Sequence, residues 1–413
     1  MAVNSKKALG FIFITLLLDV TGLGIIIPVI PQLIEGLIHG NISDASRYGG
    51  WLGFAYAITQ FICAPILGNL SDKYGRRPVL LLSLLGFGID YLLTAFAPTI
   101  HWLFVGRIIA GLFGASFTTA SAYIADVSTP ENRAQNFGLI GAAFGLGFIV
   151  GPVIGGLLGG YGPRVPFFAA SALCFLNTIY GYLVLPESLP VNLRRSFDWK
   201  RANPLGALMH LRKYPAVAGL VVSVTLVYVA AHAVQSTWTF YNIEKFGWSE
   251  KMIGYSLGFV GLMIALVQGV LIRAIIPKLG NERSLYAGLL FATVGYCLYG
   301  FATESWMMFA FTVVYCMGGI AGPALQGIIS LAVPANEQGE LQGALTSLMS
   351  ATAIVGPPMM TNLFSHFTQP GAKIHFAGAP FLMAALLVLV SSMLAYRSLH
   401  AHIRPEKAGR GSN

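Results

Sequence analysis

The chain has 413 residues, of which 55% are hydrophobic and only 10% are charged, and its mean hydropathy is +0.70. A soluble domain of this size does not need so much apolar content, so the composition predicts an all-α membrane protein that crosses the bilayer many times. The formal net charge of +9 does not indicate nucleic acid, because the cations lie in short loops and tails rather than on one basic face. This distribution is typical of the excess of Lys and Arg in cytoplasmic loops.

Polar clusters, prolines and glycines divide the chain into apolar segments close to the ~20 residues that a spanning helix needs. We expect 12 transmembrane helices, near residues 8–34, 48–70, 78–97, 101–124, 136–159, 165–185, 214–243, 251–276, 284–302, 305–332, 340–365 and 376–400. The cationic clusters fall between alternate pairs of these segments and in both tails. Since Lys and Arg resist translocation, this face and both termini are predicted to be cytoplasmic.

The first segment contains one carboxylate, Asp19, within the run 18–24. Asp19 lies about 12 residues past the cytoplasmic entry, or roughly 18 Å into the helix. A carboxylate at that depth normally faces a polar cavity or a partner, and it is a candidate proton acceptor. The alternative is a structural Asp that is hydrogen-bonded to a neighbouring helix.

A tight polar turn separates the second and third segments. Asp72, Arg76 and Arg77 follow Gly68, and Pro78 opens the next apolar run. The arrangement Gly-x-x-x-Asp-x-x-Gly-Arg-Arg resembles the loop between helices 2 and 3 of the major facilitator superfamily. The resemblance implies a fold of two six-helix bundles. The alternative, from the charges alone, is a topological anchor.

The third and fourth segments carry opposite charges at similar depth. Asp90 lies about eight residues before the turn near residues 98–99, and Arg107 about eight residues after it, so two antiparallel helices predict a buried ion pair. The pair is either structural or involved in proton transfer. The runs 89–93 and 106–108 resemble the third and fourth helices of twelve-helix drug/proton antiporters, as the run 18–24 resembles their first helix.

Two further charges, Asp126 and Arg133, lie where the fourth segment ends and the fifth begins. The resemblance implies that they join the polar turn in a cluster that fastens helices 2, 3 and 4 and breaks when the cytoplasmic side opens. We call this set the gate cluster, and it comprises Asp72, Arg76, Arg77, Asp126 and Arg133.

The fifth segment has glycines at every fourth position, Gly147, Gly151 and Gly155, with Pro152 among them. One helix face therefore lacks side chains, which permits close packing of another helix, and Pro152 introduces a kink. Generic packing explains this pattern by itself. The motif also resembles the fifth helix of antiporters, which favours export.

The longest cytoplasmic connection divides the chain into halves. We expect an N-terminal six-helix bundle at 1–185, a linker at 186–213 and a C-terminal six-helix bundle with a tail at 214–413. The middle of the linker lies either along the membrane surface or in solvent. Gly151-Pro152 recurs as Gly356-Pro357 in the second half. Such duplication is typical of alternating-access transporters, whose cavity lies between the halves.

The second half offers polar and aromatic candidates for the cavity. His232, Gln235, Trp238 and Tyr241 recur every three residues in the seventh segment, and this stripe is either a helix contact or a ligand surface. Segments 1, 4, 7 and 10 line the cavity in the superfamily that the chain resembles. The candidate substrate residues are Asp19, Gln60, Thr118, His232, Gln235, Trp238, Tyr241, Gln268 and Gln326.

Across nearly its whole length the chain resembles the tetracycline efflux pumps, especially those of class B. The supporting stretches are 71–73, 77–81, 90–93, 144–147, 246–248, 323–327 and 337–339. Those pumps carry a functional His in helix 8 and an Asp in helix 9. Here the matching helix 8 position is Ile264, and the ninth segment has no acidic residue. The proton-coupling candidates are therefore Asp19 and Asp90, with Arg107, in the first half.

The resemblance implies a secondary active transporter that exports an amphipathic organic compound in exchange for protons. The alternative is uptake of a small organic metabolite. No paired acids, histidine cluster or nucleophile–base set indicates an enzyme, and we expect no cofactor and no metal. We expect a monomer in a bacterial inner membrane, with a small-molecule substrate, protons and the lipid bilayer as its partners.

Overall fold

The apolar segments fold as α-helices in the computed structural model, which describes residues 5–114, 116–129, 132–199, 218–331, 333 and 338–400. Every regular element within these residues is helical. The all-α prediction is therefore confirmed. The N-terminal helices are α1 (Ser5–Ile26), η1 (Ile27–Val29), α2 (Ile30–Ile38), α3 (Ile42–Tyr74), α4 (Arg76–Phe96), α5 (Ile100–Leu112), α6 (Ser116–Val127), α7 (Arg133–Gly159), α8 (Val165–Val184) and η2 (Val191–Leu193).

The second half continues in the same way. Its elements are α10 (Ala218–Phe246), α11 (Glu250–Leu266), the π-helical turn η5 (Val267–Leu271), α12 (Ile272–Phe301), α13 (Ser305–Met317), η6 (Gly318–Ile320), α14 (Ala321–Leu331), α15 (Gln338–Thr368) and α16 (Ala379–Ser398). Several expected spans are built from two short helices, because prolines and glycines interrupt the run without ending the crossing. The first span, for example, is α1, η1 and α2 in succession, broken at Pro28 and Pro31.

Ten helical stretches of the described part are long and apolar enough to cross a bilayer. One of them, Glu250–Phe301, has 52 residues and contains two of the expected segments. Gly280 divides it with a φ of +75°, which is not helical. The helix α15 occupies the eleventh expected position with 31 residues, although the Gln, Ser and Thr residues in its sequence make it too polar to join the ten.

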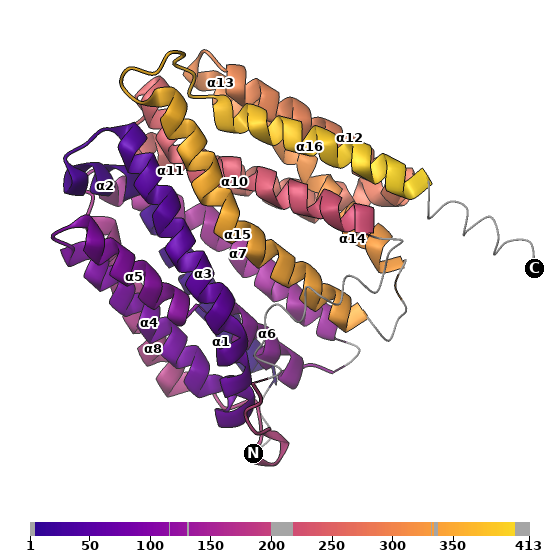
Figure 1. Ribbon diagram of the computed structural model, residues 1–413. Coiled ribbons are helices and arrows are strands. Elements are labelled where there is room, and N and C mark those ends of the chain that lie inside the picture. Colours follow the sequence, from indigo (N-terminus) through magenta and orange to yellow (C-terminus); the bar gives the residue numbers. More distant parts are fainter. Residues whose placement is uncertain are drawn as a thin grey trace, which may run out of the picture. The chain divides into compact units, whose positions relative to one another are not determined.

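The chain forms two compact units, Met1–Asn203 with Gly247–Gly261 and Pro204–Phe246 with Leu262–Asn413. In the N-terminal unit, α1 packs on α7 and α8, and α4 packs on α5 and α8. Figure 1 shows α4, α5 and α8 side by side. In the C-terminal unit, α10 packs on α15 and α16, and α12 packs on α13 and α16. The expected boundaries at 186 and 214 stay predictions; the structural division adds the start of α11 to the N-terminal unit.

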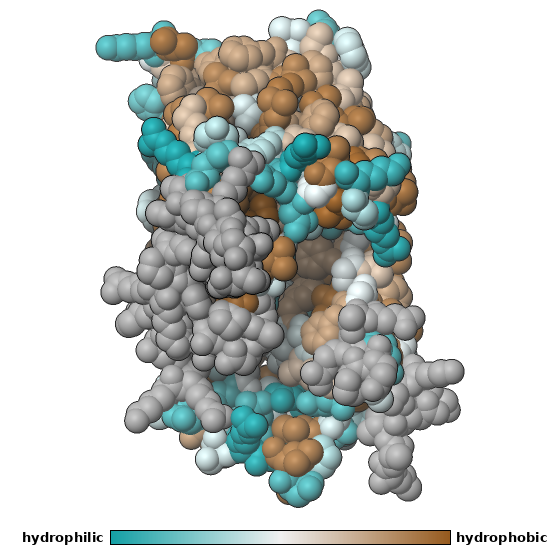
Figure 2. Space-filling model, turned by 90° about the vertical axis from the view of Figure 1, so that its right-hand side faces the viewer, coloured by the Kyte–Doolittle hydropathy of each residue, from teal (hydrophilic) through white to brown (hydrophobic). Residues whose placement is uncertain are grey.

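Exposed apolar side chains cover the outer faces of the described helices. On α16, for example, Leu386, Leu389, Val390 and Met393 are exposed along one helical stripe. Figure 2 shows broad apolar patches bordered by hydrophilic residues on the face turned toward the viewer. A soluble protein rarely exposes contiguous apolar patches of this extent, whereas a bilayer covers them.

Candidate functional site

The carboxylate of Asp19 is buried between α1 and α6, with 3% of the residue exposed. Ser116 Oγ donates a hydrogen bond to Asp19 Oδ2 over 2.7 Å. This hydroxyl is the partner on a neighbouring helix that the structural alternative requires. No cation forms a salt bridge with Asp19 within the described residues, so its charge, when present, is compensated by a hydroxyl dipole alone.

Asp90 and Arg107 form the ion pair that the helical register predicts, with Arg107 Nη2 donating to Asp90 Oδ2. The Asp90 side chain is fully buried, and 18% of the Arg107 side chain is exposed. Gly106 makes room for the pair, because a Cβ at that position would lie 2.5 Å from Asp90 Oδ1. Burial of both charges is compensated only because they are paired.

Two tyrosines are near enough to both carboxylates to interact with them electrostatically, and neither stands out in the sequence. Tyr56 on α3 interacts electrostatically with Asp19, Asp90 and Arg107. Tyr91 on α4 interacts with the same three groups. The Tyr56 hydroxyl accepts a hydrogen bond from Gln60 Nε2 over 2.9 Å, and the same Nε2 donates to the Gly114 carbonyl over 2.9 Å. The spacing of four between Tyr56 and Gln60 is the one signal that the sequence offers for this contact.

The gate cluster is centred on Arg76. Its guanidinium contacts Asp72 Oδ1 at 2.5 Å and Asp126 Oδ2 at 3.1 Å, and it donates to Ser71 Oγ over 2.7 Å. Arg76 therefore links α3, α4 and α6. The side chain of Arg133, which begins α7, lies outside the described part of the chain.

Arg77 has a different partner from the one that the resemblance implies. Its Nη2 donates to the Tyr182 carbonyl near the end of α8 over 2.5 Å, and the guanidinium lies 5.5 Å from the centre of the Tyr182 ring. Arg77 thus fastens α8 instead of contacting Asp72 or Asp126.

Sequence reasoning missed a carboxylate that completes this region, Glu187. Its Oε1 accepts from the Arg76 backbone N–H over 2.8 Å, and its Oε2 accepts from the Arg77 backbone N–H over 3.3 Å. Glu187 comes 111 positions after Arg76, so no local pattern joins the two. The Pro-Glu pair at the end of the sixth segment is the only signal.

The glycine stripe of α7 packs against α1. A Cβ at Gly151 would lie 2.7 Å from the Thr21 carbonyl oxygen, and a Cβ at Gly155 would collide with the Ile25 carbonyl. At Gly147 the obstacle is the Val20 side chain, at 2.8 Å. The expected close helix approach is therefore present, and Pro152 lies inside α7.

The neighbouring face of α7 packs against the start of α11, which belongs to the same unit. A Cβ at Gly156 would lie 3.1 Å from the Gly254 Cα, and a Cβ at Gly258 would lie 2.7 Å from a Val153 methyl group. The sequence of α7 does not name this second partner, because Gly156 lies one position beyond the four-residue stripe.

The stripe on α10 separates into two kinds of residue. Trp238 and Tyr241 are buried in an aromatic group, with ring centres 5.1 Å from Tyr299 and 4.8 Å from Phe381, respectively. The Tyr241 hydroxyl donates to the Tyr299 carbonyl over 2.6 Å. These contacts favour the helix-packing alternative for both. His232 is buried beside Gly356 of α15, whereas the exposed candidates are Gln235, Thr118, Gln268 and Gln326.

Ile264, the residue that the resemblance matches to the helix 8 histidine of the tetracycline efflux pumps, has apolar surroundings. It packs on the cluster of Val267, Cys316 and Ile320 in the C-terminal unit. No group of three or more His, Cys, Asp or Glu residues able to hold a metal ion occurs among the described residues. The C-terminal unit therefore offers no protonatable group at this position.

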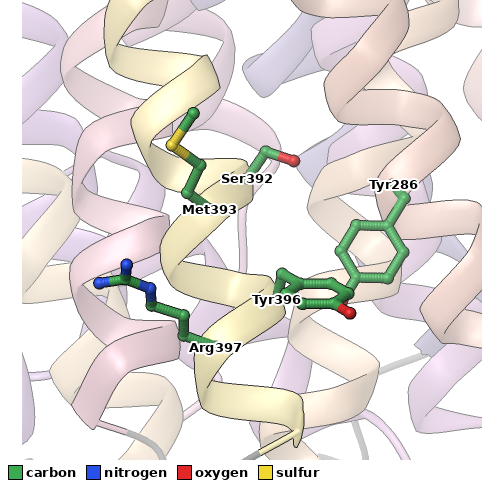
Figure 3. A pocket seen from close by; sticks show the side chains of 5 residues that line it. All are labelled: Tyr286, Ser392, Met393, Tyr396 and Arg397. Atoms are coloured by element: carbon green, nitrogen blue, oxygen red, sulfur yellow. The ribbon is translucent and has the colours of Figure 1, made fainter.

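A separate cavity of about 340 Å³ lies on the outer side of α12 and α16, and it contains none of the candidate residues. Tyr286 of α12 faces Tyr396 of α16, while Met393 and Arg397 lie one turn apart on the other side of α16 (Figure 3). The two tyrosine rings are 6.2 Å apart between centres. We assign this cavity no role in transport.

Comparison with known proteins identifies the family. The model of the Major Facilitator Superfamily matches residues 12–357 and again 274–412. The class C tetracycline resistance protein of Escherichia coli is 39% identical over 387 residues, which cover 94% of this chain and 96% of the relative. The class B protein of Escherichia coli is 34% identical over 351 residues, covering 85% and 86%. The resemblance to these proteins is therefore confirmed, and it extends beyond class B.

Solved structures agree on the fold. The human organic anion transporter MFSD10 is 24% identical, covers 95% of this chain and 99% of its own, and has a TM-score of 0.70. The family match and the tetracycline resistance relatives confirm, at the level of the family, the sequence-based prediction of a proton-coupled efflux transporter and not an enzyme. The chain therefore belongs to the Major Facilitator Superfamily, as an integral inner-membrane, proton-coupled secondary transporter related to the tetracycline resistance proteins.

Proposed function

We propose that this transporter exports an amphipathic organic compound in exchange for protons, and that Asp19 carries the exchanged proton. The observation that supports this role is the burial of Asp19 beside a single hydroxyl, without a salt bridge among the described residues. An intramembrane carboxylate without a counter-ion is expensive to keep charged and is typical of proton pathways. The relatives named for tetracycline resistance make a drug-like substrate the first class to test.

In the proposed cycle, a proton from outside neutralises Asp19 and the substrate leaves. Release of that proton toward the cytoplasm restores the carboxylate, and the transporter binds substrate again. Asp90 and Arg107 form the second part of the proton site, because the Asp90 side chain is fully buried and Arg107 is its ion-pair partner. The candidate substrate residues are Gln60 and Thr118 in the N-terminal unit and His232, Gln235, Gln268 and Gln326 in the C-terminal unit, where Trp238 and Tyr241 are buried.

The gate cluster holds the cytoplasmic ends of α3, α4 and α6 in one arrangement. Opening of that side requires a change in the contacts of Arg76 with Asp72 and Asp126, and Arg133 is a further candidate member. Such a change between discrete arrangements is a common element of switching transitions. Arg77 contributes indirectly, through its contact with α8.

We also propose that both termini face the cytoplasm and that the protein acts as a monomer. The support for the orientation is the distribution of Lys and Arg, which concentrates on one face of the twelve-segment topology. The monomeric state stays a sequence-based prediction. A membrane-impermeant amine reagent applied to intact cells is expected to leave Lys6 and Lys7 unmodified and to modify Lys373. The reverse pattern contradicts the orientation.

The decisive experiment replaces Asp19 with asparagine in purified protein reconstituted into liposomes. The asparagine side chain has a similar shape, and its amide oxygen still accepts from Ser116, so the variant D19N is expected to fold. Transport driven by an imposed pH gradient is expected to be lost, while substrate exchange without a gradient persists. Undiminished gradient-driven transport by D19N removes Asp19 from the mechanism.

A further inference from the structure

We propose that Glu187 is a positioning residue of the transport gate, and that residues 186–198, called here the linker strap, hold Arg76 in the gate cluster. The gating part of this inference rests on the function proposed above. The strap follows α8 directly and precedes the rest of the linker. The strap and the partners named below belong to the N-terminal unit.

The first argument is a reciprocal capping of two helix ends. The first backbone N–H groups of a helix have no partner within it, and neither do the last carbonyls. At the start of α4, Glu187 accepts from the N–H groups of Arg76 and Arg77, and the following residue, Pro78, has no N–H. At the end of α8, Arg77 donates to the Tyr182 carbonyl. Glu187, which follows α8, therefore caps the start of α4, and Arg77 of α4 caps the end of α8.

The second argument is electrostatic. Glu187 places a negative charge at the positive N-terminal end of α4, and Arg77 places a positive charge at the negative C-terminal end of α8. Arg194 Nη2 also lies 3.9 Å from Glu187 Oε2. The carboxylate is thus compensated from two directions, by the helix end and by a cation of the strap itself.

The third argument is close approach. Gly75 joins α3 to α4 with a φ of +107°, a conformation that favours glycine. A Cβ at this position would also collide with the Glu187 carboxylate and would lie 2.9 Å from Arg194 Nη2. Glycine is therefore needed at position 75 for two reasons: the turn requires a positive φ, and the Glu187 carboxylate occupies the space of a Cβ.

The strap is fastened at three more points along its length. Ser188 Oγ donates to Asp126 Oδ2 over 2.9 Å, which is the oxygen that Arg76 contacts. The Arg195 N–H donates to the Asp72 carbonyl over 3.0 Å. Further on, Asn69 Nδ2 donates to the Asp198 carbonyl over 2.6 Å, and the Asp198 N–H donates to Asn69 Oδ1 over 3.4 Å.

Together these contacts surround Arg76. Its own backbone N–H donates to Glu187. Of its two partners, Asp126 accepts from Ser188 through its carboxylate, and Asp72 accepts from the Arg195 N–H through its backbone carbonyl. Because the linker strap contacts Arg76 and both of its acidic partners, the geometry of the gate cluster depends on the strap. Loss of Glu187 is therefore expected to loosen the start of α4 and to let the guanidinium leave its partners.

The experiment compares Glu187→Gln, Glu187→Ala and Glu187→Asp with the wild type, and uses Asn192→Ala as the matched control. Asn192 is an exposed residue of the strap. The first measurement is hydrogen–deuterium exchange of peptides that cover residues 70–82. Exchange of the Arg76 and Arg77 amides is expected to accelerate at least tenfold in E187A and several-fold in E187Q, and to stay unchanged in N192A.

The second measurement is transport in liposomes. E187A and E187Q are expected to lower the maximal rate several-fold at an unchanged half-saturating substrate concentration, and E187D is expected to recover part of the rate. If Glu187 had only a structural role, its replacement would lower the amount of folded protein and not the maximal rate per folded molecule. The amount of folded protein is therefore measured by size-exclusion chromatography without ligand, and each rate is divided by it. Because E187Q keeps the size of the side chain, it remains informative if E187A does not fold.

The two measurements separate the inference from the function on which it rests. Unchanged amide exchange at Arg76 and Arg77 in E187Q and E187A refutes the proposal that Glu187 holds the start of α4, whatever the transport result. Faster exchange with an unchanged maximal rate refutes the gating role. Absence of any transport by the wild type refutes the function proposed above and the gating role with it. The exchange data still decide whether Glu187 holds the start of α4.

Discussion

At the scale of single residues, the N-terminal unit compensates its two buried carboxylates in different ways. Asp90 is paired with a guanidinium, whereas Asp19 accepts from a hydroxyl. The pair of Asp90 and Arg107 is nearly neutral as a unit, so its burial leaves little net charge in the interior. Among the described residues no cation forms a salt bridge with Asp19, which is the physical reason for assigning the exchanged proton to Asp19.

The buried pair has a measurable signature. Asp90→Asn and Arg107→Gln are each expected to destabilise the protein by about 3–5 kcal/mol, because each strands one charge in the interior. The double variant D90N/R107Q is expected to lose clearly less than the sum of the two. The measurement is the free energy of unfolding in detergent for all four proteins.

The matched control for this cycle is an exposed pair, Asp44 and Arg47, whose side chains are 41% and 51% exposed. Neutralising either partner there is expected to change stability by less than about 1 kcal/mol. Strictly additive losses at Asp90 and Arg107 contradict the claim that they compensate each other.

Counting residues from the turn at 98–99 was enough to predict the ion pair, because two antiparallel helices that share a turn fix the depth of both partners. The same reasoning did not reach Ser116 or Tyr56. The hydrogen bond of Ser116 to Asp19 and the position of Tyr56 depend on how α6 and α3 pack beside α1 and α4. The sequence does not indicate how helices that are not joined by a short turn are aligned with one another.

At the scale of elements, the glycine stripe of α7 was predictable but its partners were not. The four-residue spacing indicates a face without side chains, and α1 occupies that face. The approach of α11 to Gly156 and Pro152 joins segments that are distant along the chain, and only the structure shows it.

Two glycines of α7, Gly155 and Gly145, are expected to respond differently to replacement by alanine. Gly155→Ala places a methyl group against the Ile25 carbonyl of α1, and overpacking of this kind is expected to destabilise by about 1–3 kcal/mol. Gly145 lies on the same helix, and a methyl group added there has nothing within 4 Å. Gly145→Ala is therefore expected to be neutral or slightly stabilising. Midpoints of thermal unfolding in the same detergent compare the two, and equal shifts refute the packing assignment.

The linker shows where sequence reasoning stops. Solvent and membrane surface were the two expected environments for its middle, and that middle lies outside the described residues. No contact was predicted for the first part, in which residues 187–198 bond to the end of α3 and to the polar turn between α3 and α4. A short irregular segment with Pro, Glu and Arg has no periodicity, so its docking site is invisible in the sequence.

At the scale of the whole molecule, the two halves repeat one design with different residues. Gly75 and Gly280 both adopt a positive φ, of +107° and +75°, at the matching turns of the two halves. Gly151 of α7 packs on α1, and Gly356 of α15 packs beside His232 of α10. The duplication was predicted from short repeated motifs, and these contacts support it. The charges are not repeated, since Asp19, Asp90 and Arg107 belong to the N-terminal unit alone.

This asymmetry bears on the direction of transport. On the proposal that Asp19 carries the exchanged proton, the candidate proton site lies in the N-terminal unit, while an apolar group surrounds Ile264 in the C-terminal unit. We therefore expect one proton site, which is occupied either together with the substrate or in alternation with it. Exchange follows when the two compete for one conformation, and symport follows when they bind together. The family motif in α7 and the relatives favour exchange.

The test uses everted membrane vesicles whose interior is acidified and a fluorescent or radiolabelled amphipathic substrate, beginning with a tetracycline. Because the interior of an everted vesicle corresponds to the cell exterior, proton/drug exchange is expected to accumulate the substrate inside against its gradient. Collapse of the pH gradient with an ionophore is expected to release it, and D19N vesicles are expected to equilibrate without accumulation. A symporter produces the opposite sign, with substrate leaving an acidified interior together with protons. The sign of the flux therefore decides between export and uptake even when the substrate is not the natural one, since the direction is set by the coupling and not by the affinity.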